Sequence, residues 1–231
     1  MLIPSIFQDI PGDLEAANPA ATEEELSRAR SIRLRYLVPG EPEPYMVDVV
    51  RAMRLLKGMT HYAEIGTRDR GCVSYVFTLL APDPVIVDVD LLPMPQNEAM
   101  IAQELSGRAT YTLIHGDSAA ADVASRVQEA LGPGGADVIF CDSSHMYEHA
   151  LAEFERYWPL VRPGGFLMYH DVYWEGTATD KGKCQALAAI DRFVPVFVVS
   201  MNEPVHRFLP RSSKGDTWGG VAIIPKIGDS A

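Results

Sequence analysis

The sequence predicts an α/β fold in which a seven-stranded, mostly parallel sheet has helices on both faces and an antiparallel C-terminal strand. Two observations lead to this prediction. Over most of the chain, short apolar segments with strand character alternate with longer segments of helical periodicity, a pattern typical of βαβ units. The last two strand-like segments, 194–200 and 219–226, have no helix between them, so they are expected to form an antiparallel edge.

Length and charge limit what the protein can be. The 231 residues suit one main domain over 59–231, with an N-terminal arm and helical cap over 1–58. The net charge of −11 argues against nucleic acid and against an anionic membrane surface as partners. The N-terminus has no signal-peptide pattern and no apolar stretch approaches the length of a membrane span, so a cytoplasmic location is expected.

The N-terminal extension is predicted to be helical after an irregular arm. Residues 1–20 contain several prolines and little periodicity. Thr22 followed by Glu25 forms a capping-box pattern, which predicts a helix over 22–37. Apolar residues on one face predict a second helix over 45–59. These helices are expected to cover one side of the main domain or to form the contact of a homo-oligomer.

The main domain is predicted to alternate strands and helices. Its five parallel strands are expected at 61–66, 85–90, 110–117, 136–142 and 166–171. Its helices are expected at 71–80, 94–107, 118–131 and 147–161. The glycine-containing segment 173–187 follows the fifth strand and is expected to overhang the strand ends as a lid or acceptor loop.

The turn after the first strand indicates which ligand the sheet binds, because open parallel sheets bind ligands beyond the carboxyl ends of their strands. Gly66 and Gly71 are spaced as in a phosphate-binding loop. Cys72 and Val73, however, stand where that loop needs lysine and serine or threonine, which argues against an NTPase. The turn also lacks the three glycines of a dinucleotide-binding loop. Glu64 would repel a diphosphate but suits a cofactor with a sulfonium and an ammonium group.

Acidic residues recur at the ends of the next two strands. Asp88 lies 22 residues after Gly66, where a carboxylate can bind ribose hydroxyls. Asp117 ends the third strand and can reach a base. A simpler interpretation is that Glu64 caps a strand and the glycines only turn the chain. The recurrence of acids at three consecutive strand ends argues against that interpretation.

In order along the chain, the segments EIGTRDRG, VIVDVD, HGDS, ADVIFCD and LVRPGGFLMYHD resemble the successive motifs of class I S-adenosylmethionine-dependent methyltransferases. The resemblance covers about 62–226 and implies a Rossmann-like sheet with S-adenosyl-L-methionine as cofactor. By this resemblance, the methionine end of the cofactor is contacted by residues of the first turn, namely Glu64, Gly66, Thr67 and Gly71. Asp88 binds the ribose, and Asp117 and Ser118 lie at the adenine.

Two neighbouring strand ends predict a metal site. Asp142 ends the fourth strand and His170 with Asp171 ends the fifth, and adjacent strands lie about 4.8 Å apart. Carboxylates placed there can share one hard divalent cation. Catechol-type O-methyltransferases resemble this arrangement closely, with an aspartate at the first end and an Asp-Asn pair at the second around Mg²⁺. Because histidine is a poor Mg²⁺ ligand, either His170 does not bind the ion or the ion is Mn²⁺ or another metal.

The stretch after Asp142 more closely resembles bacterial enzymes related to macrolide-sugar O-methyltransferases and the cephalosporin-pathway protein, which carry an Asp-x-x-His-x-Tyr-Glu stretch and a His-Asp pair. His145 stands where catechol-type enzymes have a catalytic lysine, so it and Asp142 are the predicted catalytic residues, with His145 as general base. A structural role for His145 and a metal-free enzyme that relies on His145 alone are the alternatives. His149, one helical turn further, is expected on the surface.

The leading hypothesis is therefore methyl transfer to a hydroxyl of a small-molecule acceptor, a sugar or another antibiotic-type intermediate, assisted by Mg²⁺ or Mn²⁺. The alternatives are N-methylation of an amino sugar, an NAD-dependent oxidoreductase, and a non-catalytic protein that keeps the cofactor pocket. Turnover of S-adenosylmethionine to S-adenosylhomocysteine separates methyl transfer from the last two.

Overall fold

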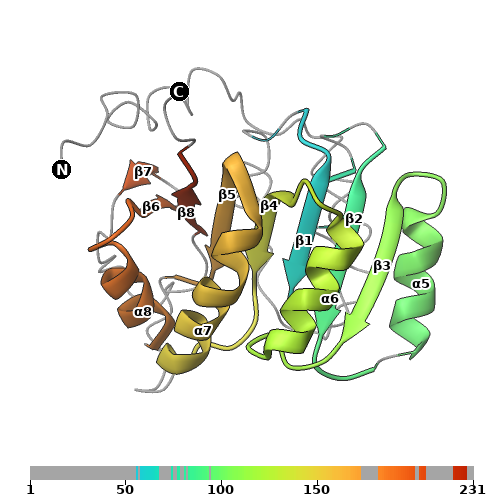
Figure 1. The fold of residues 1–231 in the computed structure, drawn as a ribbon, viewed down its shortest axis with the longest axis horizontal. Coiled ribbons are helices and arrows are strands. Elements are labelled where there is room, and N and C mark those ends of the chain that lie inside the picture. The colour runs from blue at the N-terminus through green and yellow to red at the C-terminus, as the bar shows by residue number, and fades with distance from the viewer. Residues whose placement is uncertain are drawn as a thin grey trace.

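The computed structural model of the chain describes residues 56, 58–67, 74, 77–78, 81, 83–93, 95–172, 182–200, 203–206 and 221–227. In Figure 1 these residues form one sheet with helices packed along it. The strands are β1 (His61–Ile65), β2 (Val85–Asp90), β3 (Thr110–His115), β4 (Ala136–Cys141), β5 (Val161–His170), β6 (Phe197–Ser200), β7 (Glu203–His206) and β8 (Val221–Pro225). The helices are α5 (Pro95–Leu105), α6 (Ala121–Leu131), α7 (Tyr147–Tyr157) and α8 (Gly182–Ile190), with a 3₁₀ turn, η2 (Trp158–Leu160).

The strand order across the sheet is β3-β2-β1-β4-β5-β8-β6-β7. Strands β1 to β5 pair in parallel, and β8 runs antiparallel to both of its neighbours, β5 and β6. The predicted Rossmann-like sheet with an antiparallel C-terminal strand is thus confirmed. The order reverses between β1 and β4, and α6 and α7 cover the face of the sheet that is turned to the viewer in Figure 1.

The sheet has eight strands among the described residues, whereas the sequence predicted seven. The additional strand, β7, follows β6 in the chain and pairs with it in an antiparallel manner. It was missed because its four residues, EPVH, include a proline and show no alternation of apolar and polar residues.

The predicted helices over 94–107 and 118–131 correspond to α5 and α6. The helix predicted over 147–161 ends earlier, at Tyr157, because Pro159 has no N–H to continue it and the chain tightens into η2. Val161 then begins β5, which is longer than predicted and contains a register shift against β4.

Helix α8 was not predicted, since its first six residues, 182–187, were assigned to the loop 173–187. The sequence GKCQALAAI lacks the polar face by which an amphipathic helix is recognised. Its side chains Ala186, Leu187 and Ile190 are buried, and α8 packs against α7. The remainder of the predicted lid, 173–181, lies outside the described residues.

Several other predictions also fall outside the described residues. These are the N-terminal arm, the helix over 22–37, and most of the helices over 45–59 and 71–80. Ser74, Phe77 and Thr78 are described, and all three are helical. Within the described part of the chain, no helix is both long and apolar enough to span a membrane.

Candidate functional site

A cavity of about 530 Å³ opens at the carboxyl ends of the parallel strands. It lies where the strand order reverses, between β1 and β4, which is where open α/β sheets bind ligands. Its volume is within the range of small-molecule sites. The residues that line it are Gly66, Val89, Asp90, Leu91, Gly116, Asp117, Ser118, Asp142, Ser143, Ser144 and His149.

Gly66 lies between the ends of β2 and β4 and contacts both. Its φ of 92° lies in the left-handed region that favours glycine, and its N–H donates a 2.8 Å hydrogen bond to the Val89 carbonyl. A Cβ atom at this position would collide with the backbone carbonyl of Asp142. The turn after β1 can therefore lie directly against the end of β4 only because residue 66 is glycine.

Asp90, and not Asp88, is the acidic residue of β2 that reaches the cavity. Asp90 is the last residue of the strand and lines the cavity. Asp88 lies two residues earlier and is 0% exposed, and its Oδ1 accepts a 2.7 Å hydrogen bond from Ser74 Oγ. The ribose contact stays a prediction, and among the described residues Asp90 is the acidic residue of β2 that lines the cavity, while Asp88 is buried.

Glu64 is also enclosed and is not among the residues that line the cavity. Its Oε2 accepts hydrogen bonds from the backbone N–H of Ser74, at 3.0 Å, and from Ser74 Oγ, at 2.7 Å. Ser74 Oγ is therefore 2.7 Å from both Glu64 and Asp88, yet it has one proton to donate. The second contact requires a proton on one carboxyl group. Burial and the neighbouring Asp88 raise the pKa of Glu64 to about 8, which agrees with such a shared proton.

The remaining predicted cofactor residues divide into three groups. Asp117 and Ser118 line the cavity, as the predicted adenine end requires. Thr67 is 2% exposed and does not line it, although its N–H donates a 3.2 Å hydrogen bond to Val89 and so helps to hold the turn. Gly71 lies outside the described residues.

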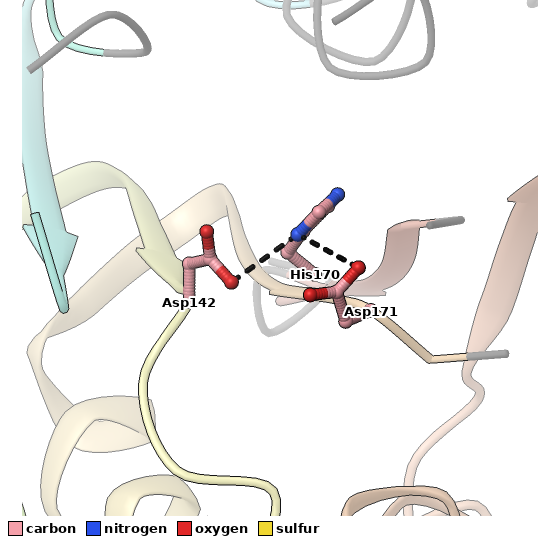
Figure 2. Close-up of side chains that lie close together, drawn as sticks. All are labelled: Asp142, His170 and Asp171. Atoms are coloured by element: carbon pink, nitrogen blue, oxygen red, sulfur yellow. Dashed lines mark hydrogen bonds and ion pairs between the residues drawn. The ribbon is translucent and has the colours of Figure 1, made fainter. Parts of the chain in front are cut away.

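Asp142, His170 and Asp171 meet at the ends of β4 and β5 and can hold a metal ion (Figure 2). Each residue offers one ligand atom, and these atoms lie within 4.8 Å of one another. His170 Nδ1 is 3.2 Å from Asp142 Oδ1 and 3.3 Å from Asp171 Oδ1. Two carboxylate oxygens and one imidazole nitrogen are a donor set that fits Mn²⁺ and similar divalent ions, while the carboxylates also suit Mg²⁺.

The electrostatics of this cluster favour a positive charge at its centre. Burial alone lowers the pKa of His170, but Asp142 and Asp171 outweigh burial and raise it to about 10. Burial alone raises the pKa of Asp171, but His170 outweighs that effect and lowers it. Asp171 also has a φ of 54°, which is uncommon for a residue other than glycine. Strained backbone of this kind often accompanies functional sites.

His145 lies beside the three-residue cluster. Its Nε2 is 3.7 Å from Asp171 Oδ2, and its side chain is 17% exposed. The loop that carries His145 is held by the first residues of α8. The Lys183 N–H donates a 2.7 Å hydrogen bond to the His145 carbonyl, and Lys183 Nζ donates one of 3.1 Å to the His170 carbonyl. Lys183 was missed because α8 itself was not predicted.

The structure adds three further residues that the sequence did not indicate. Ser143 and His149 line the cavity, and Glu153 is buried behind them. His149 was expected on the surface, but its side chain is only 24% exposed. The i, i+4 spacing of His149 and Glu153 on α7 was visible in the sequence, although nothing in it showed that this helical face turns inward.

The chain matches a family model over residues 63–172, and the description of that family is "Methyltransferase domain". These residues run from β1 to the end of the metal-ligand pair, so they include every described residue of the cavity and of the cluster. No curated protein sequence matches the chain.

Several solved structures share the fold. TomG, an O-methyltransferase of tomaymycin synthesis from Streptomyces achromogenes solved with S-adenosylmethionine, is 16% identical, with 99% of this chain and 100% of TomG covered and a TM-score of 0.59. An O-methyltransferase from Bacillus cereus, solved with S-adenosylhomocysteine, is 14% identical, with coverage of 96% and 97% and a TM-score of 0.59. MycE of the mycinamycin biosynthetic pathway, solved with Mg and S-adenosylhomocysteine, is 20% identical, with 88% of this chain but 54% of MycE covered and a TM-score of 0.52. At these identities the likeness establishes the fold.

Proposed function

We propose that the chain transfers the methyl group of S-adenosylmethionine to a hydroxyl oxygen of a small molecule, because its residues 63–172 match a family described as "Methyltransferase domain". The observation that carries this proposal is the position of Asp142, which both lines the cavity and belongs to the metal-ligand cluster. This position supports the proposal, because methyl transfer requires the cofactor and the activated acceptor to lie side by side.

The cavity residues suit the cofactor in three respects. Asp90 stands at the end of β2, where a carboxylate can accept hydrogen bonds from ribose hydroxyls. Asp117 and Ser118 stand at the end of β3, where they can bind the adenine. Gly66, in the first turn, lines the cavity where the cofactor's methionine end would lie. Bound S-adenosylmethionine would supply a methyl group on a positively charged sulfur.

The cluster of Asp142, His170 and Asp171 would hold the divalent cation, Mg²⁺ or Mn²⁺. When bound, the ion would lower the pKa of an acceptor hydroxyl and orient it. His145, next to Asp171, is placed to accept the proton of that hydroxyl. The transfer itself is an in-line displacement, so orientation of the acceptor by these residues makes up much of the catalysis.

The acceptor that we propose is a sugar or another natural-product intermediate. This part of the proposal is supported by the resemblance of the segment after Asp142 to macrolide-sugar O-methyltransferases. It is also supported by two structural neighbours, since TomG belongs to tomaymycin synthesis and MycE to the mycinamycin pathway.

Calorimetry tests the cofactor assignment. S-adenosylmethionine and S-adenosylhomocysteine are expected to bind, and Asp90→Ala is expected to weaken binding by about 1.5–3 kcal/mol, the contribution of hydrogen bonds to a charged group. Asp122→Ala, which removes an exposed carboxylate of α6, is the matched control and should bind normally. Binding of NADH together with no binding of either sulfur compound would contradict the proposal.

Chelation tests the metal. Excess EDTA should abolish turnover with an acceptor while calorimetric binding of S-adenosylhomocysteine stays within about twofold, because the ion orients the acceptor rather than the cofactor. Added Mg²⁺ or Mn²⁺ should restore turnover. Full activity in EDTA, or an unchanged rate in Asp142→Asn, would show that the enzyme works without a catalytic metal.

A further inference from the structure

Glu153 of α7 is a fully buried carboxylate that the proposed chemistry does not use. Its Oε1 accepts hydrogen bonds of 2.5 Å from Ser118 Oγ and of 2.5 Å from Ser143 Oγ. Ser118 follows β3 and Ser143 follows β4, so one oxygen atom joins the two loops that form this side of the cavity. Burying a carboxylate costs several kcal/mol unless it is paired and hydrogen-bonded, so such an arrangement calls for a specific role.

When protonated, His149 provides the opposite charge. Its Nε2 is 3.2 Å from Glu153 Oε1 and 2.9 Å from Ser118 Oγ. Because Ser118 gives its single proton to Glu153, the His149 Nε2 atom must carry the hydrogen in both contacts. The hydrogen bond that His149 donates to Glu153 raises the pKa of His149, which burial by itself would lower. The other charged groups that act on His149 are Asp117, whose Oδ1 is 4.0 Å away, and Lys183 of α8.

These contacts lie in the wall of the cavity itself, since Asp117, Ser118, Ser143 and His149 all line it. Glu153 stands directly behind that wall, and its second oxygen, Oε2, is buried without a hydrogen-bond partner among the described residues. The carboxylate of Glu153 therefore depends on the two serine hydroxyls and on His149 for its stabilisation.

We propose that His149 and Glu153 are positioning residues that clamp the loops after β3 and β4 into the wall against which the cofactor's nucleoside lies, so that cofactor affinity follows the charge on His149. The inference rests on the proposed function, because it concerns the same cofactor. When His149 loses its proton, Glu153 is left buried without its counter-ion. The contacts of His149 and Glu153 that clamp the two loops, here called the clamp, then weaken, and the cofactor binds less tightly.

The sign of the pH effect follows from this argument. The pKa of His149 is raised in the fold, so the clamp is intact at pH 6 and is lost as the pH rises through a value above the ordinary 6.5 or so of histidine. The dissociation constant of S-adenosylhomocysteine should increase by roughly tenfold between pH 6 and pH 9, because the charge-assisted hydrogen bond from His149 to Glu153 becomes a weaker, neutral one.

The test combines calorimetry with NMR titration of His149 in the free protein. In Glu153→Gln, S-adenosylhomocysteine should bind more weakly at pH 6 and show less than about a twofold change up to pH 9, and the pKa of His149 should fall toward its ordinary value. In His149→Gln, which keeps a side-chain donor and removes the titration, the pH dependence should also vanish. Glu155→Gln, an exposed residue of the same helix, should keep the wild-type profile.

Two outcomes would overturn the inference while the proposed function stands. One is the same pH profile of binding in wild type, Glu153→Gln and His149→Gln. The other is an ordinary pKa of His149 in the wild-type protein. Failure of S-adenosylhomocysteine to bind wild type at any pH would instead reject the proposed function, and the inference with it. His149 is partly exposed, so His149→Gln is expected to fold even if Glu153→Gln does not. In that case the pH dependence of binding in His149→Gln decides the test.

Discussion

At the scale of single residues, His145 is the side chain whose role is most open to direct measurement. Its Nε2 is 3.7 Å from Asp171 Oδ2, so it shares the acceptor side of the site with the metal-ligand cluster. If it accepts the proton of the acceptor hydroxyl, His145→Ala should lower kcat by about 10²–10⁴ with little change in cofactor affinity. The wild-type rate should rise with pH through roughly 6–7.5, and the variant should lose that rise.

A second variant separates loss of the base from disturbance of the loop after β4. His145→Gln keeps a polar side chain of similar reach but cannot accept a proton near neutral pH, so it should be as slow as His145→Ala. A loss of less than about tenfold with the pH profile preserved would assign ionisation of the acceptor to the metal alone.

At the scale of elements, the first turn of α8 supports the site from behind. A Cβ atom on Gly182 would come within 2.8 Å of the His145 carbonyl oxygen and would overlap the backbone N–H of Tyr147. Gly182→Ala should therefore push α8 away from the loop after β4 and from the end of β5, to which Lys183 is hydrogen-bonded. We expect a loss of about 1–3 kcal/mol in stability, typical of overpacking, and weaker Mn²⁺ binding.

Gly134→Ala is the control for this prediction, because a Cβ atom there meets nothing within 4 Å. Urea unfolding and Mn²⁺ titration of the two variants would make the comparison. Wild-type values in Gly182→Ala for both measurements would mean that α8 adapts to the extra methyl group and does not hold the site in place.

At the scale of the whole molecule, the shared proton of Glu64 and Asp88 links folding to pH. The folded pKa of Glu64, about 8, is above its unfolded value of 4.5. A raised pKa of an acid contributes stability that is fully present below the unfolded pKa and is lost as pH rises through the folded one. The free energy of unfolding should therefore fall by up to about 2–3 kcal/mol between pH 6 and pH 9 on account of this pair.

Glu64→Gln removes the titration while it leaves an oxygen atom that can accept a hydrogen bond from Ser74. The variant should show a flatter pH dependence of urea unfolding than wild type, and Glu155→Gln, on the surface of α7, should not. Parallel curves for Glu64→Gln and wild type would mean that the buried pair is not protonated in the folded protein.

The sequence alone determined the layout of the molecule. Apolar periodicity identified every described strand except β7 and most of the described helices, because a strand repeats every two residues and a helix every 3.6. Parallel strands end at one edge of a sheet, so Asp142, His170 and Asp171 were expected to meet, and the structure brings them together. The methyltransferase resemblance is confirmed by the family match over 63–172.

Only the tertiary structure decided which polar side chains face the cavity. Asp88 and Asp90 both belong to VIVDVD, and the choice between them depends on where β2 ends relative to the layers that cover it. Helix α8 is buried by its neighbours and so lacks the polar face that reveals a helix in a sequence. His149 and Glu153 became site residues because packing of α7 on α8 and on the sheet turned their side inward, and that orientation depends on contacts between segments far apart in the chain.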